Sequence, residues 1–162
     1  MYSFKSFLLS EGSRNFISAF HTSPKRIPSV DERPMFFSLN KKDADGWHRN
    51  SIQNHVGAYT YRARIGGSIA RHDDKNVKNI FRSAGVNQQD YHNDLASNPS
   101  AEEIKNHPGT KALQAAGHHG YIYPDYDPND FDKDSKALVS FDPSKHVELK
   151  KRQGSLASYK EN

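Results

Sequence analysis

The sequence of 162 residues contains no cysteine, and this absence constrains the fold more than any other feature. Neither a disulfide framework nor a zinc site with thiolate ligands can stabilise the chain, so packing alone must hold it together. Only 34% of the residues are hydrophobic, but 11% are aromatic, mostly phenylalanine and tyrosine. A disordered chain would be poor in aromatic residues. We therefore expect one domain with a modest core and much loop.

Charge and hydropathy narrow the choice of partners. The 23 Lys and Arg residues outnumber the 19 Asp and Glu residues, which gives a formal net charge of +4. This excess is compatible with contact to polyanions, but it does not by itself indicate nucleic-acid binding. No apolar run approaches the length of a transmembrane helix, and residues 7–9 are shorter than the hydrophobic part of a secretory signal. We expect neither a membrane partner nor export by such a signal.

Short apolar or alternating segments predict β-strands in both halves of the chain. Turn residues such as Pro24 and Gly66-Gly67 separate several of these segments. The predicted strands cover residues 15–21, 35–39, 58–65, 120–123, 137–141 and 146–149.

Three other segments have the caps and apolar spacing of helices. Asn40 can cap the first helix, which we expect to extend to about residue 55. Asp74 precedes the second helix and Gly85 ends it. Ser100 begins the third, which Pro108 interrupts before it resumes to residue 116. Strands with intervening helices and a strand-rich end favour the α+β class, as a single small domain with a split, mixed or antiparallel β core and three helices.

Several short motifs occur in a fixed order along these elements. Residues 20–23 read Phe-His-Thr-Ser at a strand end, and residues 35–39 read Met-Phe-Phe-Ser-Leu before a helix. Residues 119–123 read His-Gly-Tyr-Ile-Tyr, and residues 137–144 read Ala-Leu-Val-Ser-Phe-Asp-Pro-Ser. Over about residues 15–149 this order resembles the small ADP-ribosyltransferase-like domains of phage and mobile-element polyproteins.

The resemblance implies an ADP-ribosyltransferase-like fold with NAD as substrate. Transfer of ADP-ribose expels nicotinamide through an oxocarbenium-like transition state, so the site must hold NAD bent and stabilise positive charge. By analogy His21 would hydrogen-bond the ribose next to the nicotinamide, with Thr22 beside it. Ser38 would stand on the second strand, and Phe37 or Trp47 could offer a ring to the nicotinamide. The structural alternative is that these rings are core residues and that the histidine is an ordinary polar residue.

The catalytic acid is where the sequence departs from the family pattern. Active members carry a glutamate at or just before the last strand, but residues 132–136 here read Asp-Lys-Asp-Ser-Lys. Asp134 is the nearest acid and has a shorter reach, while Glu148 lies further on. Either Asp134 replaces the glutamate in a mono-ADP-ribosyltransferase, or the domain keeps the fold as a non-catalytic binder.

The sequence predicts no metal site. If Asp125, Asp127 and Asn129 were the first ligands of an EF-hand, Asp130 would replace the required glycine and Lys136 the bidentate glutamate. The sequence also contains no His-x-x-x-His pair with the spacing of a zinc helix.

The first residues resemble a targeting peptide. Phe4, Phe7 and Leu8 fall on one face of a short predicted helix, and Glu11-Gly12 follows shortly after. This pattern resembles the capsid-targeting peptides of internal head proteins in T-even-like phages, which a prohead protease removes after a glutamate. The resemblance implies cleavage between Glu11 and Gly12. We then expect a domain at residues 12–150 and a polar tail at residues 151–162.

Both resemblances together predict where the protein acts. We expect it in the virion head interior and then, after injection, in the host cytoplasm. Its target would be a host protein or nucleic acid in transcription, translation or defence. The alternative is a non-catalytic inhibitor, or an internal virion protein whose partner is the packaged phage DNA.

Overall fold

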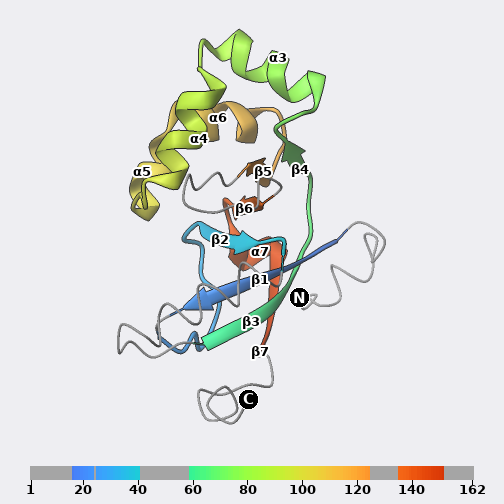
Figure 1. The fold of residues 1–162 in the computed structure, drawn as a ribbon, viewed down its shortest axis with the longest axis vertical. Helices are drawn as coiled ribbons and strands as arrows, with labels where there is room; N and C mark the ends of the chain where they lie inside the picture. Colours follow the sequence, from blue (N-terminus) through green and yellow to red (C-terminus); the bar gives the residue numbers. More distant parts are fainter. Residues whose placement is uncertain (1–15, 24, 41–58, 125–134, 152–162) are drawn as a thin grey trace.

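The computed structural model describes residues 16–23, 25–40, 59–124 and 135–151 of the chain. Seven strands in these residues form one curled sheet (Figure 1). They are β1 (Ile17–Ser23), β2 (Met35–Ser38), β3 (Tyr59–Ile65), β4 (Ile69–Arg71), β5 (Gly120–Pro124), β6 (Lys136–Ser140) and β7 (Val147–Lys151). The strand order is β4-β5-β6-β2-β1-β3-β7. Only β4 and β5 pair in parallel, so the sheet is mixed.

The described residues also contain five helices. They are α3 (Lys75–Ala84), α4 (Gln88–Ala96), α5 (Ala101–Asn106), α6 (Pro108–Ala115) and α7 (Pro143–His146). The expected α+β class is therefore confirmed. The expected number of three helices is wrong, because α4 and α7 were not predicted and the interruption expected at Pro108 separates two helices, α5 and α6.

The predicted strands occur close to their expected positions. β1 begins two residues later than predicted and continues through Ser23, because it pairs with β3 along its whole length, from Ile17–Ile65 to Ser23–Tyr59. β4 was not predicted, since three residues are too few to show an alternating pattern. It is a strand because its three residues pair in parallel with β5.

Local signals explain the helices. The Asp74 side chain caps α3 by accepting from the Asn76 N–H, and Gly85 ends this helix with a φ of 69°. α4 was missed because it buries only Tyr91, His92 and Leu95 in an otherwise polar segment. Its N-cap is Asn87, whose side chain accepts from the Asp90 N–H.

The predicted third helix is two helices. Ser100 forms the expected capping box with Glu103 at the start of α5. The chain leaves the helical conformation at His107, and Pro108 starts α6. The His107 Nδ1 atom caps α6 by accepting from the Gly109 N–H at 3.0 Å. The helix expected to follow Asn40 lies outside the described residues.

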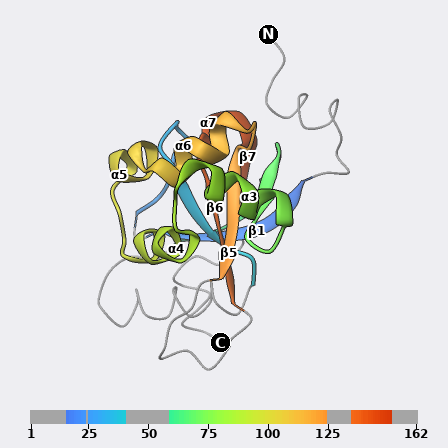
Figure 2. The ribbon, with the colours of Figure 1, turned by 90° about the horizontal axis from the view of Figure 1, so that it is seen from above.

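Two hydrophobic cores lie on opposite faces of the sheet. The helix-side core joins residues of α3, α4, α5 and α6, such as Phe81 and Tyr91, to β5 and β6 residues such as Tyr121 and Val139. Figure 2 shows these helices lying over β5 and β6. The sheet core contains only strand residues, including Ala19, Phe37, Ala63, Ile65, Ile122 and Leu138. Helices cover the β4-β5-β6 end of the sheet, whereas β1, β3 and β7 lie at the other end (Figure 1).

In the described parts of the chain, no helix has the length and apolar character needed to cross a membrane.

Candidate functional site

The candidate site lies where β1 and β2 separate. β1 pairs with β3 over all seven of its residues, but its register with β2 is the single pair Phe20–Ser38. Beyond this pair the backbones of β1 and β2 diverge, so side chains must fill the space between them. The sheet is thus opened locally between two strands that come first and second in the chain.

His21 bridges this opening. Its Nδ1–H donates to the Phe36 carbonyl oxygen at 2.6 Å, which fixes the tautomer and leaves Nε2 as an acceptor. Burial lowers the pKa of the imidazole, and the hydrogen bond to Phe36 offsets only part of that effect. The ring is therefore neutral at pH 7. No described residue makes a hydrogen bond to its Nε2 atom.

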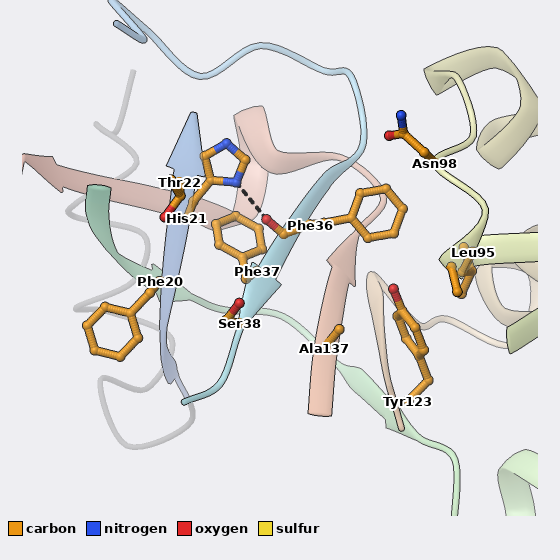
Figure 3. A pocket seen from close by; sticks show the side chains of 11 residues that line it. Phe20, His21, Thr22, Phe36, Phe37, Ser38, Leu95, Asn98, Tyr123 and Ala137 are labelled. Carbon is orange, nitrogen blue, oxygen red and sulfur yellow. Dashed lines mark hydrogen bonds between the residues drawn. The ribbon is translucent and has the colours of Figure 1, made fainter. Parts of the chain in front are cut away.

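A cleft of about 470 Å³ opens beside this histidine (Figure 3). The structure brings together in its lining the predicted site residues His21, Thr22, Phe37 and Ser38. Thr22 lies beside Thr60 of β3, and their hydroxyl oxygens are 3.3 Å apart. The two strand segments that the sequence singled out thus border one cavity.

The predicted residues approach the cleft from two sides of the sheet. Phe20 is paired with Ser38, so Thr22 and Ser38 share one face and His21 and Phe37 share the other. The ring centroids of His21 and Phe37 are 5.6 Å apart. Phe37 is 2% exposed and belongs to the sheet core, so it offers little ring surface to a ligand.

The sequence did not predict the remaining walls of the cleft. Phe20 and Phe36 contribute half-buried aromatic rings, Tyr123 contributes a ring that is only 2% exposed, and Leu95 and Asn98 enter from the end of α4 (Figure 3). Asn98 has a φ of 56°, a left-handed conformation that asparagine tolerates better than most residues. Alternation along residues 119–123 could have pointed to Tyr123, but nothing local places α4 near β1.

Several predicted residues lie outside the described part of the chain. They are Glu11, Gly12, Trp47 and Asp134. The other acid considered, Glu148, is on β7 opposite Arg64 and does not line the cleft. The described lining contains no carboxylate, lysine or arginine. Among the described residues, no group of three or more His, Asp or Glu side chains could hold a metal ion.

This arrangement can bind a flat ring. Its volume is within the range of small-molecule sites, and aromatic walls with a few hydroxyl and amide groups suit a heterocyclic ring. The neutral His21 adds an acceptor at Nε2. Comparison of this chain with protein-family models, with curated proteins and with solved structures gave no match.

Proposed function

We propose that this protein is an ADP-ribosyltransferase-like phage protein that is packaged in the virion head, injected, and directed against a host factor. NAD would bind in the cleft between β1 and β2. The observation that carries this proposal is the neutral His21, whose Nδ1–H is held by Phe36 and whose Nε2 is left as an acceptor beside the cleft. We identify the ligand as NAD from the order of the sequence motifs, which resembles that of ADP-ribosyltransferase-like domains.

The cleft suits one half of NAD better than the other. The nicotinamide ring would lie among the aromatic side chains, and His21 Nε2 would accept from a ribose hydroxyl. The hydroxyl groups of Thr22 and Ser38 offer further hydrogen bonds. The described lining supplies no cation for the pyrophosphate, so we assign it to the nicotinamide-ribose half.

Transfer would break the bond between ribose C1′ and the nicotinamide nitrogen. Nicotinamide leaves with the bonding electron pair, the acceptor's nucleophile forms the new bond to C1′, and the acceptor releases a proton. A carboxylate near C1′ would stabilise the positive charge that develops. We assign this task to Asp134.

A second candidate is a non-catalytic inhibitor or a DNA-associated internal virion protein on the same fold. The absence of a carboxylate from the described cleft lining favours it. In that case NAD, or a group that resembles its nicotinamide-ribose half, would bind without transfer.

Calorimetry with NAD and labelling of host extract with radioactive NAD separate these candidates. We expect the wild type to bind NAD, and His21→Ala to weaken binding about tenfold through loss of one ligand hydrogen bond. His118→Ala is the matched control, since His118 bonds Ser68 and does not line the cleft. Transfer that Asp134→Asn abolishes, with NAD binding retained, supports the enzyme. Binding without transfer supports the inhibitor, and no NAD binding contradicts the assigned ligand.

The packaging proposal has its own test. Mass spectrometry of the protein from purified virions should find a chain that begins at Gly12. A virion protein that still begins at Met1 would contradict removal of a targeting peptide. Glu11→Gln should block cleavage, because the protease is expected to require the glutamate.

A further inference from the structure

One row of side chains runs across the sheet from the helix-covered end to the uncovered end. Cross-strand partners on one face of a sheet lie side by side, about 5 Å apart. The registers of the pairs connect them into a continuous row, which is Tyr123, Ala137, Ser38, Phe20, Arg62 and Lys150. The first four residues line the cleft, and the last two are exposed cations on β3 and β7.

A third cation lies on the same face. Arg64 is two residues from Arg62 on β3, which places it about 7 Å further along that strand. Its guanidinium lies 4.8 Å from the centre of the Phe16 ring, as a cation–π pair. We call Arg62, Arg64 and Lys150, with the rings of Phe16 and Phe20, the basic sheet face.

This face keeps a net positive charge, because its three cations share it with one acid in register among the described residues, Glu148. None of the three cations forms an ion pair with a described residue, although ion pairs occur elsewhere, as between Arg33 and Asp31. Glu148, the acid in register with Arg64, makes no ion pair with it. Exposed cations that form no ion pair attract a polyanion and can release its counterions.

We propose that the basic sheet face binds single-stranded nucleic acid and leads a base toward the cleft. Arg62, Arg64 and Lys150 contact phosphates, and the half-buried Phe20 offers its ring to a base. Cations along a groove with aromatic rings beside them are the usual means of binding single strands without sequence preference. This binding is independent of whether the cleft takes NAD.

A single strand fits this face better than a duplex does. The Phe20 ring lies on β1 between Arg62 and the cleft, and the Phe16 ring, just before β1, packs on Arg64; only an unstacked base can stack on either ring. In a duplex the bases are stacked and paired, so only the phosphates would be contacted.

Fluorescence anisotropy with a labelled oligothymidylate of about 16 nucleotides tests the proposal without NAD. Three phosphate contacts predict a slope of about −2 for log K against log salt, or a roughly fifteenfold loss of affinity between 50 and 200 mM salt. The Arg62→Ala/Arg64→Ala variant should bind about tenfold more weakly at 50 mM salt, with a slope reduced by about 1.4. Phe20→Leu should weaken binding about tenfold without changing the slope.

The matched control is Arg71→Ala/Arg82→Ala, which removes the same charge from exposed positions on β4 and α3. It should retain wild-type affinity. The proposal is overturned if the control loses as much affinity as Arg62→Ala/Arg64→Ala, or if that variant binds like the wild type. Equal affinity for a duplex of the same length would overturn the single-strand assignment. Circular dichroism of each variant checks that the fold is intact.

Discussion

One face of the sheet has two different halves. Over β5 and β6 this face is covered by α3, α4, α5 and α6, and its side chains, such as Tyr121 and Tyr123, are buried. Over β3 and β7 the same face carries Arg62, Arg64 and Lys150, which are exposed. The cleft lies at the boundary, where α4 ends and β1 and β2 separate.

From this difference we infer that the covered half contributes mainly to stability and the uncovered half mainly to binding. The covered half contains a polar network inside its core: Tyr121 accepts from Gln88 Nε2–H at 2.8 Å and is 2.6 Å from His92 Nε2. Buried polar groups usually need partners, and in this network His92 Nδ1 has none among the described residues, so this half is demanding to pack. On the uncovered half, this face also has a buried polar residue among those described, Thr60, whose hydroxyl oxygen lies 3.3 Å from that of Thr22, whereas Arg62, Arg64 and Lys150 are exposed.

The largest expected effect is in the covered half. Phe81 is 1% exposed and packs against Tyr91 and Tyr121. Phe81→Ala should lower the free energy of unfolding by about 4 kcal/mol, measured by urea denaturation. The same substitution at the half-buried Phe20 should cost under about 2 kcal/mol. Equal losses would show that the two halves do not differ in packing.

The second largest effect should come from acid, which should lower the stability of the covered half. Burial, with a smaller effect of nearby His72, lowers the pKa of His92 from 6.5 to about 4. The unfolded chain binds this proton near pH 6.5 and the folded chain only near pH 4, so His92 makes the folded state lose stability as pH falls between these values. We expect a loss of about 2 kcal/mol from this residue.

His92→Gln should remove that contribution, because glutamine does not titrate. Thermal unfolding of both proteins at several pH values between 7.5 and 4 measures the difference. The prediction fails if the two proteins lose stability in parallel over this range. His21 has a lowered pKa with the same direction of effect, so some pH dependence should persist in the variant.

A smaller effect is expected at the edge of the covered half. The Ser100 hydroxyl accepts from the Glu103 N–H at 3.2 Å in the capping box of α5. Ser100→Ala should lower the free energy of unfolding by about 1 kcal/mol. Ser29→Ala, in an exposed loop, should change it by less than about 0.5 kcal/mol. A similar small change at Ser100 would mean that α5 does not depend on its cap.

The smallest effect on stability should come from the uncovered half. Arg62→Ala should change the free energy of unfolding by less than about 0.5 kcal/mol, because this side chain is exposed and forms no ion pair with a described residue. Arg64→Ala should cost at most about 1 kcal/mol, because it also removes the cation–π contact with Phe16. Urea denaturation checks this. A loss above about 1 kcal/mol would show that these arginines are structural and would weaken the distinction between the halves.

Much of the fold could be predicted from short segments. The strand at residues 58–65 alternates in burial along β3, and Asp74 and Gly85 mark the ends of α3. Where side chains carried no such signal, prediction failed. α4 has few apolar residues, and β4 is only three residues long, so both depend on contacts with distant segments.

The candidate site could be predicted in part. His21, Thr22, Phe37 and Ser38 were identified from motifs and do line one cleft. The parts of the lining that Tyr123 and Asn98 form could not be predicted, because these residues come from segments far along the chain. The hydrogen bond from His21 to Phe36 could not be predicted either, since it depends on two strands that diverge after one backbone pair.

The sequence by itself determined most of the described strands and the bounds of α3, because alternation, caps and turn residues act over a few neighbouring positions, but it did not reveal β4, α4 or α7. It also determined that packing must hold the chain together, since no cysteine is available. Only the tertiary structure decided that Tyr123, Ser38, Phe20 and Arg62 stand in one row. Strand order and register are set by packing between segments remote in sequence, and a shift of one residue would turn each side chain to the other face.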